Sequence, residues 1–99
     1  MQSSYAEVFQ RDMGCTETEW LSWLPRAVGA HTVQRQGPSA WVVLGAGGLH
    51  LHWQVMPARV IALIRLPVLR VDFRFEGVPP EERNAFMRHF DLTTQRGGG

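Results

Sequence analysis

Lysine is absent from this 99-residue chain, cysteine occurs once, and long apolar runs are missing. The single cysteine, Cys15, has no partner for a disulfide within the chain. The most prominent apolar run is VIALI at residues 60–64, whereas a membrane-spanning helix needs about 20 apolar residues. The opening residues MQSSYAEVFQRD include acids and lack the apolar core of a signal peptide. We therefore expect a cytoplasmic protein with no membrane segment.

The composition indicates one globular domain with a short tail. Hydrophobic residues make up 44% of the chain and charged residues 19%, which is typical of a folded protein rather than a disordered one. A chain of 99 residues has the size of one domain. We expect this domain at residues 1–92 and a flexible tail at residues 93–99, where TTQRGGG shows no hydrophobic periodicity.

The net charge of +1 conceals an uneven distribution along the chain. Residues 1–30 hold four acids and two arginines, and residues 71–99 hold five acids and four arginines. Residues 31–70 hold four arginines and no acid, together with three of the four histidines. Basic side chains are therefore concentrated in the middle of the chain, where they would attract an acidic partner or an anion.

Capping-box patterns predict two helices before residue 30. SYAE at residues 4–7 and TETE at residues 16–19 both match S/T-x-x-E, in which two side chains bond the free backbone N–H groups of a helix start. Gly14 would end the first helix and Gly29 the second. Pro25 lies inside the second apolar stripe, where we expect a kink or an end of the helix at the preceding residue.

A third helix is predicted within VPPEERNAFMRHF, residues 78–90. Pro80 suits the first turn, and the two glutamates that follow it suit the positive end of the helix dipole. Phe86 and Phe90 are four residues apart, so we expect both rings to pack on the core from one face of the helix.

Between these helices the hydrophobic period changes to two, which predicts strands. The predicted strands cover residues 31–36, 40–44, 49–55, 59–66 and 68–77. Short turns separate them, and parallel strands would need longer crossovers. We therefore predict an α+β fold, in which an antiparallel meander sheet of four to five strands packs against two N-terminal helices and one C-terminal helix.

The alternation in the predicted strands separates an apolar face from a polar one. The side chains assigned to the core face are Leu49, Leu51, Trp53, Val55, Leu69, Val71, Phe73 and Phe75. The side chains assigned to the opposite, solvated face include His50, His52, Gln54, Arg70, Asp72, Arg74 and Glu76. One face of the sheet is thus expected to meet solvent or a partner.

His50 and His52 project from the same face of one predicted strand, close enough to share a metal ion. A zinc site needs three or four ligands, and neither an HExxH nor a CxxC spacing supplies the others. We therefore predict no metal and no cofactor. We interpret the pair as polar residues on the solvated face, with a site for a small anionic ligand as the alternative.

We predict that the polar sheet face is the contact surface of the protein. Its predicted members are His50, His52, Arg59, Ile61, Leu63, Arg65, Arg70 and Arg74. Ile61 and Leu63 join it if Val60, Ala62 and Ile64 enter the core, and two aliphatic side chains there need cover from a helix, a ligand or a second copy. Because the strand aromatics are assigned to the core, we do not expect nucleic-acid binding.

No pattern in the sequence indicates a reaction. Cys15 lacks a neighbouring base and is interpreted as a structural thiol, and GAGG at residues 45–48 precedes a strand rather than the helix of a phosphate-binding loop. We predict a small non-catalytic binding module that acts through self-association as a homodimer or through an acidic protein partner. The alternative is a small-molecule or metal-binding protein, enzymes included, with His50 and His52 in a pocket between sheet and helix.

Overall fold

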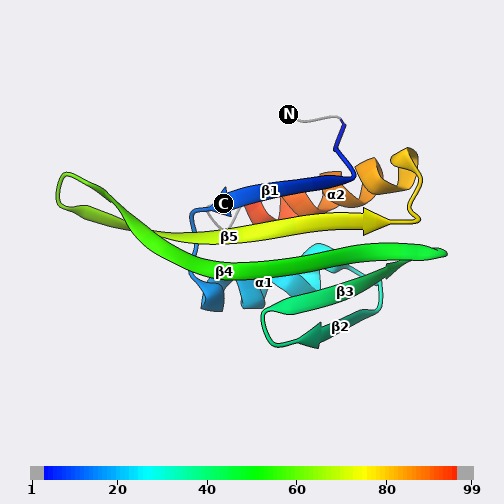
Figure 1. Cartoon of the computed structure of the whole chain (residues 1–99), viewed down its shortest axis with the longest axis horizontal. Coiled ribbons are helices and arrows are strands. Elements are labelled where there is room, and N and C mark those ends of the chain that lie inside the picture. Colours follow the sequence, from blue (N-terminus) through cyan, green and yellow to red (C-terminus); the bar gives the residue numbers. More distant parts are fainter. Residues whose placement is uncertain (1–3, 96–99) are drawn as a thin grey trace.

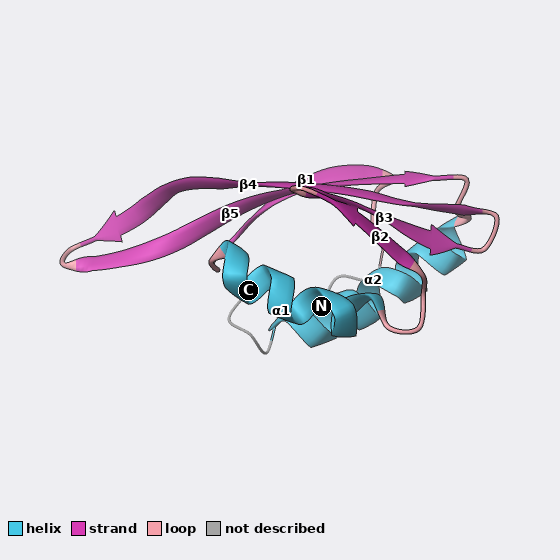
Figure 2. Ribbon diagram, turned by 90° about the horizontal axis from the view of Figure 1, so that it is seen from below, coloured by secondary structure: helices cyan, strands magenta, loops and turns pink. Residues whose placement is uncertain are grey.

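The computed structural model describes residues 4–95 and contains one five-stranded antiparallel sheet with two helices on one face (Figures 1 and 2). The predicted α+β class and antiparallel sheet are confirmed. The strand order across the sheet is β1-β5-β4-β3-β2. The elements are β1 (Val8–Met13), α1 (Glu17–Val28), β2 (Val33–Gln36), β3 (Ser39–Leu44), β4 (Gly47–Ile61), β5 (Ile64–Glu76) and α2 (Pro80–Gln95).

The N-terminal segment forms a strand, so the prediction of two N-terminal helices is wrong. Alternate side chains of β1 face the core and the solvent, which is a strand pattern that competes with the capping box at residues 4–7. Phe9 stacks on Phe73 with their ring centroids 4.6 Å apart. Pairing with the edge of β5 also satisfies main-chain groups along that edge. These long-range contacts outweigh the local helix signal.

Both remaining helices begin where the sequence predicts. At the start of α1, Thr16 Oγ1 accepts a bond from Glu19 N at 3.1 Å, and Glu19 Oε1 accepts one from Thr16 N at 2.9 Å. The helix continues through Pro25 and ends at Gly29, because packing of the buried residues around the proline holds the last turn in place. The second helix, α2, starts at Pro80 and continues to Gln95, past the predicted domain end at residue 92; residues 96–99 of the predicted tail lie outside the described residues. Neither helix in the described chain is long and apolar enough to cross a membrane.

The core lies between the sheet and the helices. Side chains with at most 5% exposure line the helix-facing side of β3, β4 and β5, namely Ala40, Val42, Leu44, Leu49, Leu51, Trp53, Leu69, Val71, Phe73 and Phe75. Trp20 of α1 fits between Trp53 and Phe90, with ring centroids 5.5 and 5.8 Å away. The predicted burial of Phe86 and Phe90 is confirmed. Both helices cover the same face, so the opposite face of the sheet is open (Figure 2).

A polar cluster joins β1 to α2 at the margin of the core. The Arg11 guanidinium donates two hydrogen bonds to the Asp91 carboxylate, and the Tyr5 hydroxyl donates a third. The guanidinium also lies 5.3 Å from the ring centroid of Phe9 and 5.4 Å from that of Phe73. Burial, together with the neighbouring Asp91 carboxylate, raises the pKa of Tyr5 above its ordinary value.

The hairpin of β4 and β5 projects beyond the rest of the sheet (Figures 1 and 2). β1 pairs with β5 only as far as Leu69, and β3 pairs with β4 only as far as His52. Residues 56–68, here called the arm, continue as a two-stranded ribbon beyond both helices. The arm therefore has neither a third strand nor a helix beside it within the described residues.

The arm corrects two sequence predictions. The predicted strand at residues 59–66 is instead the end of the hairpin, because the chain turns at Ala62 and Leu63. The predicted turn at residues 56–58 is a β-bulge between Met56 and Arg59. The turn lacks glycine, asparagine and aspartate, and Ala62 adopts a φ of 54° that usually favours glycine, so no local signal reveals it. Pro57 and Pro67, which suggested that the strands end there, are tolerated because each strand of a ribbon has one unpaired edge.

Candidate functional site

The structure divides the predicted contact surface into two parts. His50, His52, Arg70 and Arg74 lie together on the open face of the sheet, opposite the helices. Arg59, Ile61, Leu63 and Arg65 lie on the arm. The two parts share the strands β4 and β5, but they differ in chemical character.

Cross-strand pairing arranges the open-face side chains in rows. One row runs across the sheet from β5 to β2 and contains Arg74, His50, Trp41 and Gln34. The next row contains Asp72, His52, Ser39 and Gln36. Two histidines, an indole, two amides and a hydroxyl thus lie within reach of one ligand.

Acidic partners neutralise much of the open face. His50 Nε2 lies 2.8 Å from Glu76 Oε2, and Arg74 Nη1 lies 3.7 Å from the same oxygen. Arg70 donates two hydrogen bonds to the Asp12 carboxylate, at 2.8 and 3.1 Å. These bonds from Arg70 lower the pKa of Asp12 below its ordinary value. Because Asp12 belongs to the strand that the sequence assigned to a helix, its place on this face could not be foreseen.

Trp41 is the largest of the open-face residues that sequence reasoning missed, which also include Gln34, Gln36 and Ser39. Its half-buried indole lies over Gly48, where an added Cβ would come within 2.3 Å of Cζ2. The indole and the His50 ring have their centroids 4.4 Å apart. The strand AWVVL is apolar on both faces, so alternation alone cannot tell which face Trp41 occupies. Glycine at residue 48, in the strand that follows, is the one signal of space beside a large ring.

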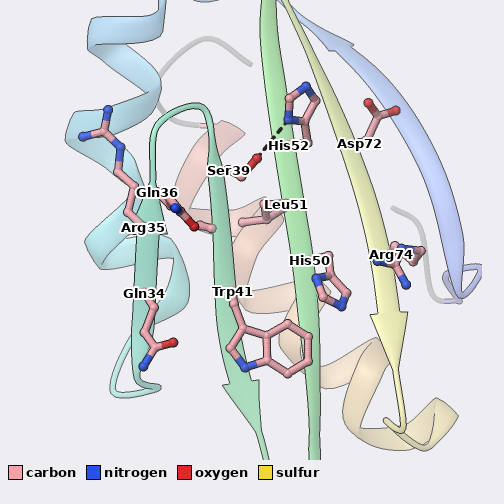
Figure 3. A pocket seen from close by; sticks show the side chains of 11 residues that line it. Gln34, Arg35, Gln36, Ser39, Trp41, His50, Leu51, His52, Asp72 and Arg74 are labelled. Carbon is pink, nitrogen blue, oxygen red and sulfur yellow. Dashed lines mark hydrogen bonds between the residues drawn. The ribbon is translucent and has the colours of Figure 1, made fainter.

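These side chains surround a shallow hollow of about 570 Å³ on the open face (Figure 3). Among its lining residues, Ser39 Oγ lies 3.0 Å from His52 Nδ1. The side chains that line it include Gln34, Gln36, Ser39, Trp41, His50, His52, Asp72 and Arg74. Both histidines therefore lie away from the helices, and not in a pocket between sheet and helix.

The described residues do not assemble a metal or thiol site. Within residues 4–95, no three His, Cys, Asp or Glu side chains come together in a way that could hold a metal ion. His50 and His52 instead contact different partners, Glu76 and Ser39. Burial, with a smaller contribution from the charge of Glu19, raises the pKa of Cys15 to about 11. At neutral pH this thiol is therefore protonated and is a poor nucleophile.

The arm carries aliphatic side chains in solvent. Arg59 pairs with Leu66 and Ile61 with Ile64, so these side chains share one side of the ribbon, whereas Val60 and Arg65 share the other. Val55, which the sequence assigned to the core, is 69% exposed, so that prediction is wrong. Val60 and Ile64, whose burial was the condition for placing Ile61 and Leu63 on the polar face, are 57% and 59% exposed because no helix reaches them. The side of the arm that continues the open face, here called the arm face, consists of Met56, Arg59, Ile61, Ile64, Leu66 and Val68.

The hollow and the arm face are the two candidate binding surfaces. The hollow is lined mainly by polar and charged side chains around the Trp41 indole, and the arm face is aliphatic with one charge. Comparisons of the chain with protein-family models, with curated proteins and with solved structures find no match.

Proposed function

We propose that the protein is a non-catalytic binding module that self-associates through the arm face. The supporting observation is the exposure of its aliphatic side chains. Ile61, Ile64 and Leu66 are 53%, 59% and 41% exposed, and Leu63 at the turn is 100% exposed. Soluble monomers rarely leave such contiguous apolar patches in water, and patches of this kind commonly mark contact surfaces.

The ribbon itself also favours a partner. An isolated two-stranded hairpin is at best marginally stable in water, and added packing against its apolar face stabilises it. Between Val68 and the turn at Ala62 and Leu63, the arm has no such packing from residues 4–95. A partner on the arm face would bury the exposed side chains and hold the two strands together at the same time.

The charge distribution favours a second copy over an acidic partner. Arg59 is the single charged residue of the arm face, and it lies at the base of the arm, where it and Asp12 line the same small hollow. The outer part of the face, around Ile61 and Ile64, is uncharged. Two such faces related by a two-fold axis would match each other in chemistry, and two-fold dimers are the commonest soluble oligomers.

We expect two copies of the arm to pack face to face rather than to pair through their strand edges. Pro57 and Pro67 lie in the two strands of the arm and have no backbone N–H to donate to an added strand. Burial of a whole aliphatic side chain contributes about 1.5–3 kcal/mol. Because the aliphatic side chains of the arm face are few and each is only partly exposed, we expect a dimer that depends on protein concentration.

Sedimentation velocity over a series of protein concentrations tests this proposal. We expect the wild-type mass to rise from 11.2 kDa towards twice that value, and the double variant Ile61→Ser, Ile64→Ser to remain monomeric. The matched control is Val8→Ser, Leu92→Ser, which removes aliphatic side chains that are 62% and 56% exposed outside the arm. A wild-type chain that stays monomeric, or a control that loses the dimer as fully as the arm variant, refutes the proposal.

A further inference from the structure

The open-face hollow contains a fixed aromatic platform. Figure 3 shows the Trp41 indole lying along the sheet with its ring face turned outward. Gly48 leaves the space beneath the ring, and the neighbouring His50 ring packs against it. Because the indole is already held by these contacts, a ligand that stacks on it loses little freedom of the protein side chain.

The rim of the platform offers both hydrogen-bond donors and acceptors. Gln34 and Gln36 point from β2 towards the hollow, and neither side chain has a hydrogen bond within the described residues (Figure 3). Each amide can donate and accept. Across the hollow, His52 bonds Ser39 through Nδ1, which leaves its Nε2 for another partner. A ligand rich in groups that both donate and accept would satisfy this rim.

The charges of the hollow argue against a phosphate or a nucleic-acid strand. Two arginines line the hollow, but Arg35 pairs with Ala40 and its side chain points away from the hollow (Figure 3). Arg74 lies beside Glu76, and Asp72 lies on the same row as His52. Carboxylates at these positions would oppose the attraction of the Arg74 guanidinium for an anion. The hollow is also shallow and open, whereas apolar ligands are usually held in enclosed pockets. A neutral, polar ligand with one apolar face fits these conditions.

We propose that the hollow binds a neutral saccharide. The C–H face of one sugar ring rests on the Trp41 indole, and its hydroxyls exchange hydrogen bonds with the amides of Gln34 and Gln36 and with His52. Each hydroxyl both donates and accepts, as the rim requires. This site uses no residue of the arm, so it stands or falls independently of self-association.

The test follows the backbone and side-chain N–H signals of the ¹⁵N-labelled full chain by NMR during titration. The probes are maltotetraose, cellotetraose and N-acetylated chitotetraose, with inorganic phosphate and uridine monophosphate as anionic probes. We expect at least one sugar to produce saturable shifts of the Trp41 indole N–H and of the Gln34 and Gln36 side-chain amides. We expect the anions to leave these signals unchanged. If no sugar shifts these signals, or if only an anion does, the proposal is overturned.

Two variants separate binding from folding. The double variant Gln34→Ala, Gln36→Ala changes only exposed side chains, and we expect it to weaken sugar binding at least tenfold without changing the rest of the spectrum. Trp41→Ala should abolish binding, and Trp41→Phe, which keeps a smaller platform, should retain part of it. Val43→Ala is the matched control on the same strand and face. Sugar shifts that survive both the Gln and the Trp41→Ala variants also overturn the proposal.

Discussion

At the scale of single residues, Gly48 controls the form of the open face. A Cβ at this position would come within 2.5 Å of the Trp41 ring and of the Val42 carbonyl oxygen. We predict that Gly48→Ala lowers the free energy of unfolding by about 1–3 kcal/mol, the usual cost of overpacking, and displaces the indole. Urea denaturation and the chemical shift of the Trp41 indole N–H measure the two effects. If the Gly48→Ala variant has wild-type stability and an unshifted indole signal, the contact between residue 48 and Trp41 is unimportant.

Cys15 gives the protein a specific response to alkaline pH. Its pKa is about 11 in the folded chain against 9.0 without the fold, so the folded state keeps a proton that the unfolded state loses. The stabilisation is complete below pH 9 and is lost as the pH rises through about 11. We predict that unfolding becomes easier across this interval by up to about 3 kcal/mol. Tyr5, whose pKa is also raised, contributes in the same direction from a higher starting value.

Urea denaturation between pH 8 and pH 11 measures this response, with Cys15→Ala as the comparison. The variant is expected to be less stable at pH 8, because it loses buried packing, but to lose less further stability as the pH rises. If both proteins show the same slope of stability against pH, Cys15 does not cause it. The thiol should also react slowly with a disulfide reagent at pH 8 until the chain unfolds.

At the scale of elements, β1 is held to α2 by the cluster around Asp91. We predict that Asp91→Ala lowers the free energy of unfolding by about 2–3 kcal/mol, because it leaves the partly buried Arg11 and Tyr5 groups without their acceptor. Asp12→Ala is the control, since it removes an exposed ion pair from the same strand and should have a much smaller effect. Chemical denaturation of both variants measures the difference. Equal losses of stability would mean that the cluster does not anchor β1.

The same elements show how far the sequence predicts the fold. The alternation from Leu69 to Glu76 predicts the buried and solvated sides of β5, because both are unambiguous in polarity. The sequence does not predict β1, because its short pattern fits a helix or a strand. Phe73, on which Phe9 of β1 stacks, is far away in the sequence. The turn at Ala62 escapes because no turn-forming residue marks it. Local signals thus determine elements with their own periodicity, whereas distant partners determine the others.

The candidate site is also predicted in part, where local periodicity determines it, and missed where distant partners determine it. His50 and His52 are placed correctly on the open face because β4 alternates clearly around them. The bulge after Met56 shifts the register and brings Ile61 to the side of the ribbon that continues the open face. Ile61 nevertheless lies away from the histidines, because the arm projects beyond the body (Figure 2). Part of the neutral character of the open face comes from Asp12, which reaches this face only through the pairing of β1 with β5. Sequence spacing cannot reveal either of these long-range effects.

At the scale of the whole molecule, the chain consists of a two-layer body and a projecting arm (Figure 2). The body buries its apolar side chains between sheet and helices, whereas the arm leaves Ile61, Leu63 and Ile64 in solvent. This contrast supports the proposed self-association through the arm face. We therefore expect the arm to be the least stable part of the monomer and to gain order on association.

Contacts between the arms of two molecules test this central claim most directly. The measurement is an isotope-filtered NOE experiment on an equal mixture of labelled and unlabelled chains at a concentration where the dimer forms. We predict NOEs between molecules that join the methyl groups of Ile61, Ile64 and Leu66 across the interface. A dimer whose NOEs between molecules lie elsewhere, or a chain that shows none at any concentration, would contradict the account.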